Sequence, residues 1–365
     1  TALVLSLFFV SGATALVYEV VWSRMMMHVF GSTALAVGTV LAAFMTGMAL
    51  GAWLIGRVAD QSHNCLRLYA WLELGIALAA LGSHLLLSQL GPAHRAMYEL
   101  LGSSAAVFGP TRFLLAFLLV MAPTVLMGAT LPVLARYLVN RQTLVGVKLS
   151  TLYATNTLGA VTGVLLTGFF LIGRFGIHLP VYLAVAGNLL IGAVAWFVSL
   201  RTRTPVSAEH ADETPSAGSP AGTAESLGPG VYRIILLGLG VSGFTSFAYE
   251  IYWTRSLVFI LGNSTYALTT MLSAFLTGIA LGGYLARFAI KWAHDRSVVF
   301  GWIQVGLGLI SALALPLLFF FADAQSLGQY LDSTSSQAAS LIFTGFALAY
   351  LLMLIPATLI GATFP

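Results

Sequence analysis

Charge is scarce in this sequence of 365 residues: only 8% of them are Asp, Glu, Lys or Arg, and there is a single cysteine, Cys65. Soluble domains contain about 25% charged residues, so the composition excludes an ordinary soluble protein. One cysteine also excludes an internal disulfide and a cysteine-based metal cluster. The histidines lack metal-binding spacing, and no Ser/His/Asp set or carboxylate dyad is recognisable. We therefore predict no catalytic residue, no metal and no cofactor.

Long apolar segments dominate instead, with 59% hydrophobic residues and a mean hydropathy of +0.93. A helix needs about 20 apolar residues to cross a hydrocarbon core of about 30 Å. Backbone groups in lipid must be satisfied internally, which favours helices here because the windows show no alternation of period two. The sequence predicts an all-α polytopic membrane protein with about ten transmembrane helices, near 2–22, 34–56, 68–90, 113–138, 149–172, 179–200, 234–254, 266–290, 298–322 and 339–365.

The basic residues indicate the orientation in the membrane. If the N-terminus is cytoplasmic, eleven of the 16 Lys and Arg residues lie in the cytoplasmic loops. This asymmetry follows the positive-inside rule and predicts a cytoplasmic N-terminus. Because these residues are spread thinly between the spans, the net charge of +4 does not indicate a nucleic-acid partner. The expected surroundings are a lipid bilayer.

An internal repeat organises the chain. Segment 11–56 recurs 231 positions later, with 19 of 46 aligned residues identical, and further matches at offsets of 231 and 233 extend the repeat over four spans. A period that encloses six spans returns the chain to the same side, so both copies point the same way, like the two halves of major facilitator transporters. We expect a six-helix repeat at 1–200, a flexible cytoplasmic linker at 201–231 and a second repeat at 232–365, truncated after four helices.

The element Tyr-Glu-x-x-Trp-x-Arg occurs in both copies and places a carboxylate deep in an apolar helix. A buried carboxylate is costly in a membrane, so its duplication suggests a shared role. One interpretation is a solute site near the pseudo-twofold axis, where the glutamates attract a cation and the aromatic rings offer cation–π faces. Its candidate residues are Glu19, Glu250, Tyr18, Tyr249, Trp22 and Trp253.

The other interpretation is an aromatic belt at the outer interface, with the glutamates held in structural ion pairs. The depth of the tyrosines and tryptophans in the membrane is enough to favour the belt for these residues. The cost of burying a carboxylate in both copies favours the solute site for the glutamates. Arg24 and Arg255 are the candidate ion-pair partners. Positions i and i+5 lie about 140° apart on a helix, so a pair needs either a broken helix end or a partner elsewhere. The cross-copy pairs Glu19 with Arg255 and Glu250 with Arg24 become possible if the first and seventh spans face each other.

Glycine and proline motifs are also duplicated. Gly47-x-x-x-Gly51, its copy Gly278-x-x-x-Gly282 and Gly159-x-x-x-Gly163 predict close helix packing. Pro123-x-x-x-x-Gly-Ala-Thr-x-Pro132 is repeated from Pro356 onward, and its prolines indicate kinks that serve either gating or a static bundle. In a major facilitator arrangement, spans one, four, seven and ten line the cavity, and these spans carry the glutamate and proline motifs.

Three motifs together resemble a known family. They are Ser-Gly-x-x-x-x-x-Tyr-Glu-x-x-Trp-x-Arg, the Pro-x-x-x-x-Gly-Ala-Thr-x-Pro segment and Leu152-Tyr-Ala-x-Asn-Thr-Leu-Gly-Ala160. They are similar to the membrane part of the bacterial fused major facilitator/spermidine synthase-like proteins. The resemblance implies the bacterial inner membrane, polyamine or aminopropyl chemistry, and a C-terminal synthase-like domain as a partner. That domain is missing from this sequence, so no transferase residue carries over.

Three functional hypotheses follow from this reading. The first is a module that binds or moves a small cationic solute such as an amine or polyamine. The second is the membrane anchor of a polyamine aminopropyltransferase-like enzyme, and the third is a structural accessory subunit that contacts other membrane subunits.

Overall fold

The computed structural model of the chain describes residues 2–30, 33–62, 64–89, 105–138, 145–201, 229–261, 265–292, 296–322 and 338–363. Helices account for nearly all of these residues, and no strand occurs among them. In chain order the elements are α1 (Ala2–Phe30), α2 (Thr33–Gln61), α3 (Cys65–Ser88), α5 (Ala105–Leu138), α6 (Val145–Leu165), the π-helix η2 (Leu166–Leu171), α7 (Ile172–Phe175), α8 (His178–Arg201), α9 (Pro229–Leu261), α10 (Thr265–Trp292), α11 (Arg296–Ala322) and α13 (Ala338–Ala362).

Each predicted window coincides with a long helix or, for 149–172, with the continuous rod formed by α6, η2 and α7. Seven helical segments in the described residues are long and apolar enough to cross a membrane, which identifies a helical membrane protein. They are Ala2–His28, Leu35–Ala59, Cys65–Ser88, Pro110–Leu138, Leu149–Phe175, His178–Arg201 and Thr265–Ala286. Ten spans remain a prediction. The expected linker falls mainly on 202–228, outside the described residues.

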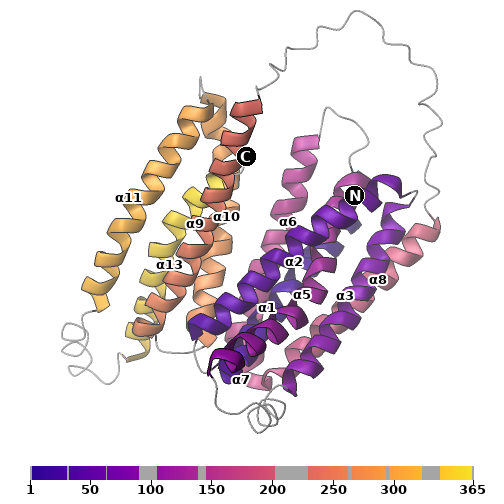
Figure 1. Cartoon of the computed structure of the whole chain (residues 1–365), viewed down its shortest axis with the longest axis horizontal. Coiled ribbons are helices and arrows are strands. Elements are labelled where there is room, and N and C mark those ends of the chain that lie inside the picture. The colour runs from indigo at the N-terminus through magenta and orange to yellow at the C-terminus, as the bar shows by residue number, and fades with distance from the viewer. Residues whose placement is uncertain are drawn as a thin grey trace, which may run out of the picture.

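The helices form two groups (Figure 1). One contains α1, α2, α3, α5, α6 and α8, and the other contains α9, α10, α11 and α13. The groups contact each other through α6, η2 and α1 with α10, and through α2 with α9. A cluster of buried apolar residues fills this boundary, and we call it the boundary cluster. It includes Leu16, Val20, Val37, Ala160 and Val164 from the first group and Trp253, Leu268, Met271, Leu272 and Phe275 from the second.

Helix packing repeats along with the sequence. In the first group a Cβ added at Gly51 would overlap the carbonyl of Val125, and in the second one at Gly282 would overlap the carbonyl of Thr358. These pairs are related by the sequence offsets of 231 and 233. Equivalent approaches join Gly128 to Met48 and Gly361 to Ile279, and Gly75 to Leu126 and Gly306 to Leu359. The α2–α5 and α10–α13 pairs therefore pack through the same positions.

The Gly-x-x-x-Gly motifs pack helices together, as predicted. Besides the α2–α5 contact, Gly159 and Gly163 of α6 lie against the backbone carbonyls of Phe9 and Ala13 in α1. Gly12 of α1 meets the carbonyl of Asn156 in return. A methyl group at any of these positions would collide with backbone, so only glycine permits this separation of the helices.

The π-helix η2 interrupts α6 where it meets α10. Gly168 packs directly on the side chain of Thr269, and the ring of Phe169 stacks on that of Tyr266 with centroids 5.7 Å apart. Single π-helical turns inside α-helices change the register of the side chains that follow. Here the altered turn lies at the contact between the two groups.

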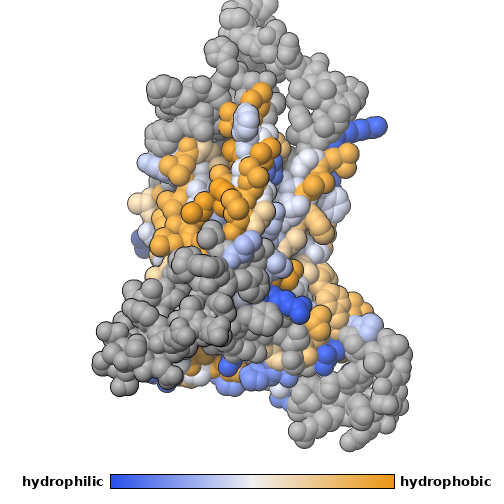
Figure 2. Space-filling view, turned by 90° about the vertical axis from the view of Figure 1, so that its left-hand side faces the viewer, coloured by the Kyte–Doolittle hydropathy of each residue, from blue (hydrophilic) through white to orange (hydrophobic). Residues whose placement is uncertain are grey.

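An apolar stripe covers the outer face of α11. Val298, Trp302, Val305, Leu309 and Leu313 recur every three or four residues and are all more than half exposed. Figure 2 shows the side of the molecule that carries α11, where hydrophobic side chains cover much of the described surface. An exposed stripe of this length on a membrane protein is suited to contact with lipid.

Candidate functional site

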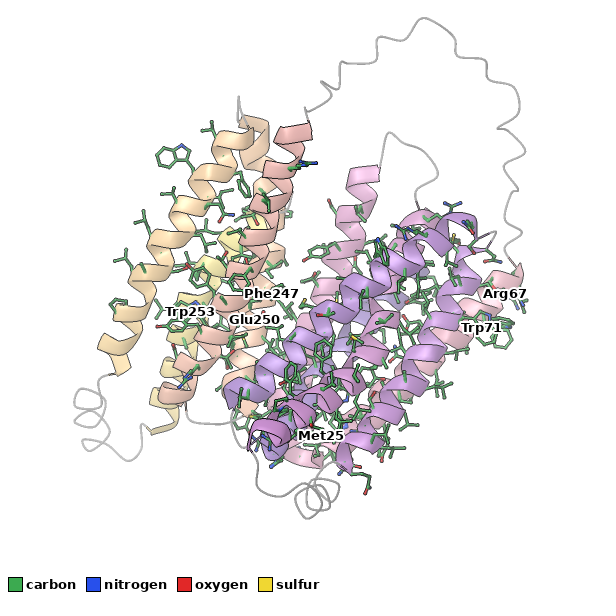
Figure 3. The ribbon with its side chains drawn as sticks, in the orientation of Figure 1. Met25, Arg67, Trp71, Phe247, Glu250 and Trp253 are labelled. Atoms are coloured by element: carbon green, nitrogen blue, oxygen red, sulfur yellow. The ribbon has the colours of Figure 1, made fainter. Side chains whose placement is uncertain are left out.

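Glu19 of α1 and Glu250 of α9 both lie at the boundary between the two groups. Their exposed fractions are 6% and 3%, so both carboxyl groups are buried. Leu16 and Val20, which flank Glu19, belong to the boundary cluster, and so does Trp253, one turn after Glu250. The two glutamates are close enough for their charges to interact. Figure 3 labels Glu250 and Trp253 on α9, where this helix lies beside the first group.

Neither carboxyl group has a partner within the part of the chain that the structure describes: no hydrogen bond and no ion pair is formed by Glu19 or Glu250 there. Burying an unpaired charge is strongly unfavourable, more so beside a like charge. The site therefore calls for a positive charge or a proton from outside these residues.

Arg24 and Arg255 do not supply this charge. Arg24 is partly exposed and Arg255 is exposed, and no ion pair joins either of them to a glutamate among the described residues. The arginines lie five residues beyond the glutamates, on a different face of each helix. Their predicted pairing across the copies is thus not formed in this structure.

The aromatic residues divide between two environments. Tyr249 and Trp253, which lie before and after Glu250 along α9, pack at the boundary cluster. Tyr18 and Trp22 instead enter the core of the first group, where their rings stack with centroids 5.3 Å apart. Tyr18, Trp22 and Trp253 are at most 3% exposed, so the expectation of an interfacial belt is wrong for these three residues.

A second buried constellation joins α1, α3 and α8 around Glu73, which is 0% exposed. Ser11 Oγ donates to Glu73 Oε1 at 2.6 Å, and Asn188 Nδ2 donates to Glu73 Oε2 at 2.6 Å. The Tyr18 hydroxyl donates to Asn188 Oδ1 at 2.8 Å. Both carboxyl oxygens are satisfied by protein groups, in contrast to Glu19 and Glu250. Glu73 therefore serves to hold three helices together.

The second copy contains the same contact in a neutral form. Gln304 Nε2 donates to Ser242 Oγ at 2.8 Å, and these residues are the equivalents of Glu73 and Ser11 at the offset of 231. Glu73 is thus an interhelical hydrogen-bonding group, and the sequence motifs did not identify Ser11 as its partner. The signal was present, because Ser-Gly opens the repeat in both copies and Glu73 aligns with Gln304.

Polar contacts also connect the two ends of the antiparallel pair α3 and α8. At one end His84 Nε2 and His178 Nδ1 lie 2.9 Å apart, and at the other Asn64 Nδ2 donates to the carbonyl of Ser199 at 3.5 Å. With the Glu73–Asn188 contact in the middle, the pair is bridged at three levels. Asn156 likewise bridges helices, donating to the carbonyl of Phe8 at 3.2 Å.

The predicted proline kinks fall inside continuous helices, since α5 runs through Pro123 and Pro132 and α13 runs through Pro356. Proline lacks the N–H that would bond the carbonyl four residues earlier, which for Pro123 is that of Leu119. Ser83 of α3 donates its hydroxyl to this carbonyl at 2.6 Å. A neighbouring helix thus replaces the lost bond, as expected in lipid. A gating role for these prolines stays a prediction.

No group of three or more His, Cys, Asp or Glu side chains able to hold a metal occurs in the residues that the structure describes. Glu19 and Glu250 are therefore the candidate site, with Tyr249 and Trp253 beside them.

Comparison of the chain with protein-family models, with curated proteins and with solved structures gives no significant match in any of the three.

Proposed function

We propose that this protein binds a small cationic solute between its two helix groups and moves it across the membrane. The observation that carries the proposal is the pair Glu19 and Glu250: two buried carboxyl groups at equivalent positions of the repeat, within electrostatic range of each other and without a protein counter-charge among the described residues. A ligand with positive charge would relieve both the burial and the mutual repulsion. The adjacent Tyr249 and Trp253 are suited to pack against its alkyl chain or its charge.

The location supports movement as well as binding. The carboxyl groups border the contact between the two halves of a repeat, and transporters built from repeats bind their solutes at such boundaries. We further propose a major facilitator-like arrangement of two parallel halves in a bacterial inner membrane, with a cytoplasmic N-terminus. An amine or polyamine is the solute class proposed, on the resemblance to the synthase-fused family.

The test compares the wild type with Glu19→Gln, Glu250→Gln and the double variant, after purification and reconstitution into liposomes. Uptake of radiolabelled spermidine and its equilibrium binding are measured. Each single variant is expected to bind at least about tenfold more weakly, because a hydrogen bond to a charged group is lost. Glu73→Gln is the matched control, since this buried carboxyl group is satisfied by Ser11 and Asn188. Unchanged binding and uptake by a folded double variant would refute the proposal.

A further inference from the structure

Two threonine side chains are buried on η2 and α10, helices that contact each other across the boundary between the two groups. Thr167 of η2 is 0% exposed and Thr270 of α10 is 3% exposed. Neither Oγ1 atom has a hydrogen-bond partner among the described residues. Buried hydroxyls are nearly always bonded, so each unpaired one needs an explanation.

Other threonines on the same helices show what is missing. A helical threonine usually donates to the carbonyl four residues earlier. In α6, Thr155, Thr157 and Thr162 do so at 2.8–2.9 Å, and in α10 the neighbouring Thr269 donates to the carbonyl of Thr265 at 2.7 Å. The hydroxyls of Thr167 and Thr270 therefore lack the bond to the carbonyl four residues earlier that neighbouring threonines form.

The internal repeat sharpens the contrast. Thr39 of α2 is identical to Thr270 at the offset of 231 and is buried to the same degree, 2% exposed. Its hydroxyl donates to the carbonyl of Leu35 at 2.7 Å. The same residue in the same helical position is thus satisfied in one copy and unsatisfied in the other. The unsatisfied copy belongs to α10, the helix that contacts η2.

Thr167 belongs to η2 and Thr270 to α10, and these two helices contact each other across the boundary between the groups. Gly168, the residue after Thr167, packs on Thr269, the residue before Thr270. Val164 and Met271 beside them belong to the boundary cluster, which also contains the residues that flank Glu19 and Trp253 near Glu250. One apolar cluster is thus bordered by two unpaired carboxyl groups and two unpaired hydroxyls.

We infer that Thr167 and Thr270 are ligand-binding groups, which accept hydrogen bonds from the N–H groups of an alkylammonium ligand while Glu19 and Glu250 supply the charge. This inference rests on the proposed function and adds a specificity to it. A carboxylate attracts any cation, but a hydroxyl oxygen distinguishes a primary ammonium, which has N–H donors, from a quaternary ammonium, which has none. The site therefore selects primary amines over quaternary ones.

The experiment measures the dissociation constants of 1,4-diaminobutane and of its bis-trimethylammonium derivative for the purified chain by isothermal titration calorimetry. The wild type is expected to prefer the diamine by about tenfold or more, since this discrimination depends on hydrogen bonds to a charged group. Thr167→Val and Thr270→Val are expected to lose most of this preference. Thr167→Ser, which keeps a hydroxyl, and Thr39→Val, whose hydroxyl is satisfied within its own helix, are expected to retain it.

The outcomes separate this inference from the proposed function. If the wild type and both valine variants bind the two ligands alike, while Glu19→Gln abolishes binding, the hydroxyls have no part in recognition and only the inference fails. If the wild type binds neither ligand, the proposed function and the inference both fail. A valine variant that unfolds or loses thermal stability in the absence of ligand would also overturn the inference, because its hydroxyl would then be bonded within the protein.

Discussion

Replacement of Glu73 by glutamine is expected to leave the stability of the protein nearly unchanged, whereas replacement by leucine is expected to destabilise it strongly. The second copy supplies the reason, because Gln304 already holds this position and bonds to Ser242. A glutamine at position 73 can direct its oxygen to Asn188 and its amide N–H to the Ser11 hydroxyl, which can accept as well as donate. Every group of the constellation then keeps a partner.

Leucine removes both acceptors at once. Ser11 and Asn188 now donate to Glu73 at 2.6 Å each, and both would be left buried without it. An unsatisfied buried polar group costs about 1–3 kcal/mol, so the two together predict a loss of about 2–6 kcal/mol. For Glu73→Gln we expect a change below about 1 kcal/mol, within the usual range of a retained hydrogen bond.

Thermal unfolding of the purified protein in detergent, followed by tryptophan fluorescence and by circular dichroism, measures this difference. The expected order of midpoint temperatures is wild type close to Glu73→Gln, with Glu73→Leu far lower. If Glu73→Gln lost as much stability as Glu73→Leu, the negative charge itself would be required, and the equivalence with Gln304 would be refuted.

Three further predictions use the same unfolding measurement. Ser83→Ala removes the donor to the Leu119 carbonyl, which Pro123 leaves free in α5, and should lower the free energy of unfolding by about 1–3 kcal/mol. An unchanged midpoint temperature would show that another group bonds this carbonyl. Gly51→Ala should push α2 away from α5 and lower the free energy of unfolding by about 1–3 kcal/mol. Gly82→Ala, where nothing lies within 4 Å of the added methyl group, should leave the stability unchanged. Equal effects of the two substitutions would contradict the close packing at Gly51. Tyr18→Phe should cost about 0.5–1.5 kcal/mol by removing the 2.8 Å bond to Asn188, and no loss would mean that this bond contributes nothing.

Apolar length and the internal repeat predicted much of the fold. Helix positions followed from length because a segment that is apolar throughout has few alternatives in lipid. The repeat predicted more than its own existence: the glycines it aligned, such as Gly51 and Gly282, meet equivalent carbonyls in the two helix groups. Where a neighbouring backbone must approach closely, glycine is required at the equivalent position of both copies, and an alignment of the two copies shows it.

The sequence did not predict which neighbouring helix each side chain packs against. Depth along α1 assigned Tyr18 and Trp22 to the outer interface, but the partners that bury them include Asn188, which is 170 residues away. Position along a single helix contains no information about such a neighbour. The two copies also differ, since Trp253 faces the boundary cluster whereas its equivalent Trp22 faces the core of the first group.

The π-helix was likewise unpredicted. Leu166–Leu171 contains no proline, and its composition resembles that of the α-helix before it. This segment contacts α10, a helix about 100 residues further along, and tertiary contacts of this kind can override local preference. The candidate carboxyl groups, by contrast, were identifiable from sequence because charge is rare here and occurs twice in one motif.

The three polar bridges between α3 and α8 have a mechanical consequence. They lie near both ends and the middle of the pair, at His84–His178, Glu73–Asn188 and Asn64–Ser199. Sliding one helix along the other by a single turn of about 5.4 Å would break all three together. The two helices are therefore expected to travel as one stiff unit, so that any change of shape concentrates where the groups meet, at Glu19 and Glu250.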